Sequence, residues 1–318
     1  MFLSPVAMHI PDGFLSVLVS VILWIFSIAL VAYGLRRVGK ELGERQLPLM
    51  GVLAAAIFAG QMLNFTVFGG TSGHLMGAAI ATILVGPWAA ILVITTVVGV
   101  QALIFQDGGL VVLGANIFNM AIVGVAVSYM AFRLVQRIAS GCNWGLFVGG
   151  FLAAWLSVEI ASLSVALQLA LSGTSPANLA IPTMAVIHAL IGIGEGLITV
   201  GALAFLNAAR PDMLVEEKST KGSNAILWVG GLLIALLLAI ASPLASAHPD
   251  GLEWVADQQG FLGADQGPLY KVIPDYVLPG ISNEALATIL AGVLGVVIIL
   301  GVTLAVAFTR RNRQTTGS

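Results

Sequence analysis

Charged residues are scarce in this sequence: Asp, Glu, Lys and Arg make up 9% of the 318 residues, whereas 58% are hydrophobic. A soluble chain carries roughly a quarter charged residues. The composition therefore argues against a soluble protein with a large apolar core and indicates an integral membrane protein with several spans. The net charge is −2 and no basic patch is present, so we expect no nucleic-acid partner.

Three further features of the sequence exclude kinds of site or reaction. The one cysteine, Cys142, cannot form an internal disulfide, and a thiolate metal cluster is ruled out as well. No G-x-x-x-x-G-K-[ST] phosphate loop is present, so ATP hydrolysis is not expected in this chain. The absence of an H-E-x-x-H zinc pattern argues against a membrane metalloprotease. We expect a protein that is not an enzyme and has no resident cofactor.

Apolar runs predict an all-α integral membrane protein with about nine transmembrane helices. The uncharged stretch 46–106 could hold two or three spans. Three spans keep the basic residues on one side of the membrane, as the positive-inside rule favours, and glycine-rich turns at 68–73 and 86–88 would separate them. The predicted spans are 16–38, 48–67, 74–85, 88–105, 110–132, 144–171, 183–207, 225–245 and 285–308.

The nine predicted spans also predict how the chain is oriented in the membrane and how it divides into units. In a bacterial or archaeal plasma membrane, we expect the N-terminus outside the cell and the C-terminus in the cytoplasm. Lys271 is then the one basic residue outside. We expect an extension at 1–7, a seven-helix unit at 8–209, a cytoplasmic linker at 210–224 and a two-helix unit at 225–318. An outside loop at 246–284 belongs to the last unit.

Two of the four histidines, His9 and His74, fall at the predicted outer face. Two imidazoles at one membrane surface favour a transition-metal site; the alternative is a pair of interfacial polar residues that cap helices. If Met8 were the working N-terminus, its amine, the His9 amide nitrogen and the His9 imidazole would form fused chelate rings. His74 would complete four nitrogens in a plane, as Ni²⁺ or Cu²⁺ prefers. A tight turn at 11–13 would bring the amine back over the outer end of the helices. The segment 1–7, too short for a signal peptide, is then expected to be absent from the mature protein.

Four motifs carry a family resemblance: "MHIPDGFLS" (8–16), "GGTSGHLMG" (69–77), "QALIFQDGGLVVLGANIFNMA" (101–121) and "IHALIGIGEGLIT" (187–199). The chain resembles the NikM/CbiM family, the substrate-binding S components of nickel/cobalt energy-coupling-factor (ECF) transporters. The resemblance implies a seven-helix bundle that binds Ni²⁺ or Co²⁺ through Met8, His9 and His74. It also implies two kinds of partner, a transmembrane coupling (T/Q) subunit and cytoplasmic ATPase (A/O) subunits.

A second resemblance lies in the late loop. "HPDGLEWVADQQGF" (248–261) is similar to the PDGLE segment of the two-span N component of nickel systems. This resemblance implies that the M and N components are fused in one chain, and it favours nickel over cobalt as the metal. The early "HIPDGF" and late "HPDGLE" could both be turns, or His248 could pass metal to the outer site.

Other polar residues lie in or near the predicted spans. They could form hydrogen bonds between helices, or they could support the metal site or line a pathway: Asp12, Asn64, Gln101, Asn116, His188, Glu195 and His248. A rival function, a proton-coupled secondary metal transporter, would use Glu159, His188 and Glu195. Ala55 and Ala59 are four residues apart, a spacing that lets helices approach closely. The family resemblance implies that this helix face contacts the coupling subunit, and internal packing is the alternative.

Overall fold

The computed structural model describes residues 8–41, 46–214 and 224–315, so the predicted extension 1–7 and much of the predicted linker lie outside the described residues. The described chain is almost entirely helical. Its helices are α1 (Val17–Glu41), α2 (Gln46–Gln61), α3 (Ala78–Val85), α4 (Pro87–Val100), α5 (Leu113–Ile117), α6 (Gly124–Ala139), α7 (Trp144–Ser172), α8 (Ala177–Ala209), α9 (Asn224–Ala241), α10 (Gly251–Gln259) and α11 (Glu284–Thr315).

Shorter elements join these helices. The π-helical segment η1 (Gln101–Phe105) continues α4, and η2 (Phe118–Val123) makes α5 and α6 one continuous helix. Single 3₁₀ turns occur at η3 (Pro211–Met213), η4 (Ser242–Leu244), η5 (Leu262–Ala264) and η6 (Pro274–Tyr276).

The predicted fold class is confirmed, because six helical segments of the described chain are long and apolar enough to cross a membrane: Val17–Val38, Pro87–Phe105, Leu113–Ala139, Trp144–Ser172, Ala177–Ala209 and Glu284–Val306. Two shorter apolar helices, Pro48–Gln61 and Trp228–Leu244, fall at two more predicted spans. The eight-residue α3 corresponds to the predicted short span. The predicted count of nine is thus matched only roughly.

A β-hairpin replaces the end of the second predicted span. The helix stops at Gln61, and β1 (Phe65–Val67) pairs antiparallel with β2 (Thr71–Gly73). The cause is local: Gly69 and Gly70 adopt φ of +95° and +80°, a backbone that a tight turn needs and a helix cannot contain. His74 therefore follows a strand in an extended segment, and the next helix begins four residues later.

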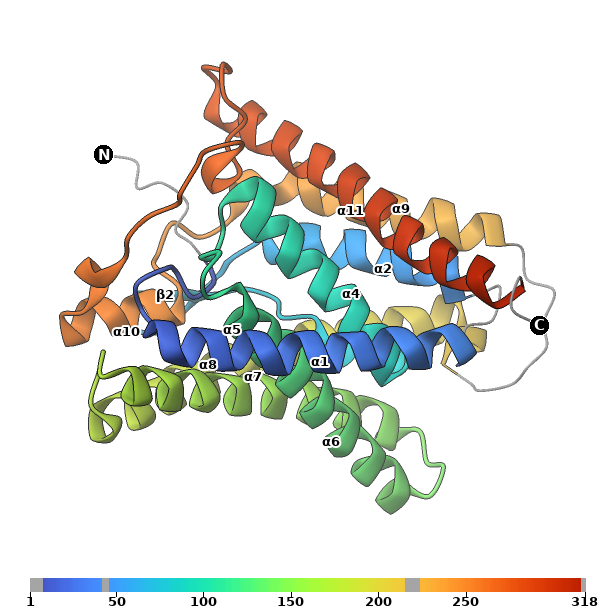
Figure 1. Cartoon of the computed structure of the whole chain (residues 1–318). Helices are drawn as coiled ribbons and strands as arrows, with labels where there is room; N and C mark the ends of the chain where they lie inside the picture. The colour runs from blue at the N-terminus through green and yellow to red at the C-terminus, as the bar shows by residue number, and fades with distance from the viewer. Residues whose placement is uncertain (1–7, 42–45, 215–223, 316–318) are drawn as a thin grey trace.

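The two C-terminal long helices pack onto the N-terminal part of the chain. Helices α9 and α11 both lie against α2, and α11 also contacts α4 (Figure 1). This packing contradicts the predicted partner contact at Ala55 and Ala59, because both side chains are 0% exposed within the chain itself. Internal packing, the alternative explanation for these small residues, accounts for them.

The segments that carry the predicted metal ligands gather at one end of the bundle. The segment before α1, the strand β2 and the helix α10 lie together there (Figure 1). Helix α1 runs away from this end, so Arg36 and Arg37 in its last turns lie remote from His9. Arg137, in the last turn of α6, lies at the far end of that helix as well.

Candidate metal centre

Residues 8–16 are fixed to the segment that follows η1. The Asp12 carboxylate accepts hydrogen bonds from the backbone N–H groups of Leu110, Val111 and Val112, at 3.0, 2.9 and 3.1 Å. These N–H groups open the turn that leads into α5, where a helix leaves donors unsatisfied. The side chain of Asn116 pairs with both backbone groups of Ile10, at 3.1 Å each. The main chain before α1 therefore has one defined path.

Two glycines let these segments approach closely. A Cβ on Gly108 would lie 2.8 Å from the Cβ of His9, and a Cβ on Gly109 would lie 2.1 Å from Oδ1 of Asp12. The two glycines of the "DGG" sequence at 107–109 thus let the backbone of this segment pack directly against His9 and Asp12, where a side chain would clash.

We expect Asp12→Ala to destabilise the protein by about 1–3 kcal/mol, because it leaves three N–H groups without their acceptor at a largely buried position. The thermal unfolding of the detergent-solubilised chain measures this effect. Asp12→Asn keeps one carbonyl oxygen and should lose less. Unfolding of Asp12→Ala at the wild-type temperature would contradict the role assigned to this carboxylate.

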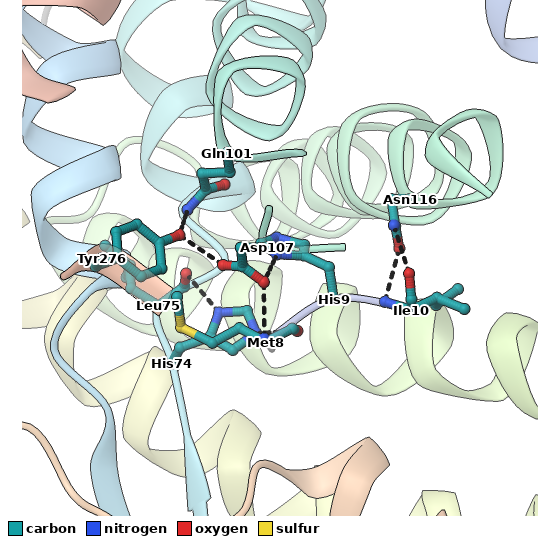
Figure 2. Close-up of polar contacts among 9 residues, drawn as sticks. All are labelled: Met8, His9, Ile10, His74, Leu75, Gln101, Asp107, Asn116 and Tyr276. Atoms are coloured by element: carbon teal, nitrogen blue, oxygen red, sulfur yellow. Dashed lines mark hydrogen bonds and ion pairs between the residues drawn. The ribbon is translucent and has the colours of Figure 1, made fainter. Parts of the chain in front are cut away.

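The main chain at Met8 and the His9 ring converge on one oxygen atom. The Met8 backbone nitrogen donates to Oδ1 of Asp107 at 2.8 Å, and Nδ1 of His9 lies 2.8 Å from the same oxygen (Figure 2). These are two of the nitrogens that the predicted chelate requires. A carboxylate oxygen therefore occupies the point on which both of them are directed.

His74 approaches His9 from the segment after β2. Its ring centroid lies 5.6 Å from that of His9. Nδ1 of His74 lies 3.1 Å from the Leu75 carbonyl oxygen, and Nε2 lies 3.1 Å from the Met8 carbonyl oxygen. A neutral imidazole carries one N–H and can donate to only one of these two carbonyl oxygens. The tautomer with the proton on Nδ1 leaves a lone pair on Nε2, as a metal ligand requires.

Burial and charge set the protonation of these groups. Burial alone would lower the pKa of His9, but the charge and hydrogen bond of Asp107 raise it above its usual value. Burial would raise the pKa of Asp107, and His9 holds it below its usual range. Burial and the neighbouring His9 lower the pKa of His74. These shifts favour an ion pair between His9 and Asp107 beside a neutral His74, and a metal ion bound to Nδ1 of His9 would replace its proton.

A cavity of about 100 Å³ adjoins the two imidazoles. His188 of α8 and Asp250, the N-cap of α10, also line it. Burial raises the pKa of Asp250 to about 6, with a further contribution from Asp107. Nε2 of His9 is buried without a hydrogen-bond partner. Among the described residues, no group of three or more His, Cys, Asp and Glu side chains is placed to hold a metal.

Four of the other predicted site residues hold segments around the site. Asp12 and Asn116 hold the backbone of the ligand segment, as described above. The Glu195 carboxylate accepts from the backbone N–H groups of Met76 and Gly77, at 2.7 and 2.9 Å, and so holds the segment that carries His74. Gln101 donates to the hydroxyl of Tyr276 at 3.0 Å.

The remaining predicted residues are not brought to the cavity. The carbonyl of Asn64 accepts from Ser246, and its side chain does not line the cavity. The His248 side chain is exposed, although its carbonyl oxygen accepts from the Ser72 hydroxyl at 2.8 Å. Glu159 of α7 is also absent from the cavity lining.

Three residues at the site were missed by the sequence analysis: Asp107, Asp250 and Tyr276. Asp107 had a usable signal, since it is an acid at the end of a predicted span, beside two glycines, in one of the four motifs that carry the family resemblance. Asp250 belongs to the late Pro-Asp-Gly turn. It reaches the site because Ser72 donates to the Pro249 carbonyl at 2.8 Å, which joins that turn to β2. Tyr276 had no sequence signal.

Comparison with known families identifies two regions of this chain. Residues 9–213 match the family model CbiM, described as the cobalt uptake substrate-specific transmembrane region. Residues 225–312 match the PDGLE domain. The first match covers more than half of the 318 residues.

Individual relatives agree with these matches. A protein of Archaeoglobus fulgidus described as a fused nickel transport protein NikMN is 38% identical over 96% of this chain and 99% of its own length. The fused nickel transport protein NikMN of Rhodobacter capsulatus is 30% identical over 92% of this chain and 95% of its own length. A crystal structure of a truncated transition metal transporter is similar over 63% of this chain and 99% of its own, with 31% identity and a TM-score of 0.57.

Proposed function

Because this chain belongs to the family described as the cobalt uptake substrate-specific transmembrane region, followed by a PDGLE domain, we propose that it is the substrate-specific component of an ATP-driven energy-coupling-factor transporter that takes up Ni²⁺. At the coarser level, the chain is a nickel/cobalt transport component of the CbiM/NikM type with several membrane spans, and it is not an enzyme.

The proposed ligands are the amine of Met8, the amide nitrogen and Nδ1 of His9, and Nε2 of His74. The observation that carries this proposal is the convergence of the Met8 nitrogen and His9 Nδ1 on one oxygen, at 2.8 Å each, with His74 beside them. The proposal requires residues 1–7 to be absent from the working protein, so that Met8 carries a free amine.

Nickel is the proposed ion rather than cobalt. Four nitrogens in a plane, one of them a deprotonated amide, suit a tetragonal ion such as Ni²⁺ or Cu²⁺. The PDGLE match and the description of two fused relatives as nickel transport proteins support the same choice.

ATP hydrolysis is assigned to partner subunits, since the sequence has no phosphate loop. We propose a transmembrane coupling subunit and cytoplasmic ATPase subunits as partners, in a plasma membrane with His9 at the outer face. The position of Arg36, Arg37 and Arg137 at the helix ends remote from His9 supports this orientation. Residues 8–209 would bind the metal, and residues 225–318 would form the two-helix unit.

The rival function, proton-coupled secondary transport, has less support. It requires Glu159, His188 and Glu195 to act together along a pathway. Glu195 is engaged with two backbone N–H groups, and Glu159 does not line the cavity that His188 reaches.

Reconstitution should separate the two functions. Proteoliposomes that hold this chain with its coupling and ATPase subunits should accumulate radioactive Ni²⁺ only when ATP is present on the ATPase side, because the chain has no means to hydrolyse ATP. Proteoliposomes that hold this chain alone should show no uptake driven by a pH gradient. Gradient-driven uptake by the chain alone would reject the ECF proposal in favour of the secondary transporter.

A further inference from the structure

A chain of buried hydrogen bonds leads from the C-terminal unit to the proposed metal ligands. The Tyr276 hydroxyl donates to Oδ2 of Asp107 at 2.5 Å and accepts from Gln101 at 3.0 Å. The other oxygen of the same carboxylate holds the Met8 nitrogen and Nδ1 of His9 (Figure 2). One carboxylate therefore connects a tyrosine of the late loop to two of the nitrogens proposed to bind the ion.

The late loop is docked so that this tyrosine reaches the carboxylate. Tyr276 is 5% exposed, and its ring stacks on Phe105 with centroids 4.9 Å apart and planes 17° from parallel. The backbone of Tyr276 has a φ of +57°, in the left-handed region that residues with a Cβ rarely adopt. Backbone held in such a conformation costs of order 1–3 kcal/mol and is concentrated at functional sites.

We propose that Tyr276 is a positioning residue of the metal site, supplied by the C-terminal unit. Its hydroxyl fixes the plane of the Asp107 carboxylate, so that Oδ1 stays where the Met8 nitrogen and His9 Nδ1 converge. The two nitrogens are thereby held side by side before the ion arrives, and the ion then takes the place of Oδ1 between them. This inference rests on the proposed function, because it assumes that these nitrogens bind the ion.

The size of the effect follows from how metal sites respond to their supporting groups. Residues that orient metal ligands through hydrogen bonds typically change metal affinity by about 10- to 100-fold when they are replaced. Tyr276→Phe removes only the hydroxyl and keeps the ring that stacks on Phe105. We therefore expect this variant to bind Ni²⁺ about 10-fold or more weakly than the wild type.

Tyr270 provides a matched control in the same loop. Its hydroxyl donates to the Leu103 carbonyl at 2.8 Å, so it also joins the late loop to η1, but it does not touch Asp107. If docking of the loop alone mattered, Tyr270→Phe and Tyr276→Phe would have similar effects. If Tyr276 acts through the carboxylate, Tyr270→Phe should bind Ni²⁺ as the wild type does.

The experiment measures Ni²⁺ binding by isothermal titration calorimetry on the full chain from Met8, in wild type and both variants, together with thermal unfolding without metal. In the reconstituted transporter, Tyr276→Phe should raise the KM for Ni²⁺ by a similar factor and leave the maximal rate near the wild-type value. A role in folding alone would lower the maximal rate instead. In an Asp107→Ala background, Tyr276→Phe should cause no further loss.

The outcomes separate this inference from the function on which it rests. Absence of Ni²⁺ binding by the wild type would overturn the proposed function and this inference with it. Wild-type binding together with an unchanged affinity in Tyr276→Phe, or an equal loss in both tyrosine variants, would overturn the inference alone. If Tyr276→Phe fails to fold, Gln101→Met, which removes the donor to the tyrosine oxygen, should weaken Ni²⁺ binding in the same direction; unchanged affinity in that variant would also overturn the inference.

Discussion

Replacing His9 by alanine should abolish high-affinity binding and uptake of nickel. The substitution removes Nδ1, the atom proposed to close one chelate ring, and it leaves the Asp107 carboxylate without its ionic partner. Loss of a supporting group costs about 10- to 100-fold in affinity, so loss of a ligand should cost on the order of 100-fold or more. Calorimetry on the purified chain and uptake of radioactive Ni²⁺ by cells that express the whole transporter would measure the two effects.

His248→Ala is the matched control for this prediction. His248 also precedes a Pro-Asp-Gly sequence, but its side chain is exposed and lies outside the cavity lining. The His248→Ala variant should bind and transport Ni²⁺ as the wild type does. If His9→Ala bound Ni²⁺ with an affinity within a few-fold of the wild type, the proposed chelate would be wrong. Equal losses in both variants would indicate that the late loop contributes a ligand of its own.

The membrane-spanning helices could be predicted from sequence because lipid leaves the backbone few choices. A long apolar run must satisfy its own hydrogen bonds as a helix, and six of the predicted spans correspond to long apolar helices. The hairpin at Phe65–Gly73 could not be predicted in this way, since its strands have three residues each and follow directly from an apolar helix.

Site residues could be predicted only where they are adjacent in the sequence or belong to a recognisable motif. Met8 and His9 are adjacent in the sequence, and His74 belongs to a recognisable motif. Asp107 and Tyr276 are 169 residues apart, and their contact depends on how the late loop docks on η1. No local pattern encodes that docking. The partner contact predicted at Ala55 and Ala59 failed for the same reason, because the chain's own C-terminal helices cover α2.

The N-terminal amine itself is the subject of the second large prediction. A chain that begins at Met8 should bind Ni²⁺ on the order of 100-fold or more tightly than the chain that begins at Met1, since losing a ligand should exceed the cost of losing a supporting group. A free α-amino group, with a pKa of about 7.7–8.0, offers a lone pair near neutral pH. The peptide nitrogen of an internal Met8 offers none until it loses its proton. Calorimetry on both chains would measure the difference.

The control for the amine keeps every residue and removes only the lone pair. A chain that begins at Met8 with its amine acetylated has no free amine, so its affinity should fall toward that of the longer chain. The hydrogen bond from the Met8 nitrogen to Asp107 needs only an N–H group, so all three chains should unfold at similar temperatures. Equal Ni²⁺ affinity in the three chains would show that the amine is not a ligand. The ion would then have to be held by the two imidazoles and the amide nitrogen of His9 alone, a smaller set of nitrogens that favours nickel less strongly over its neighbours.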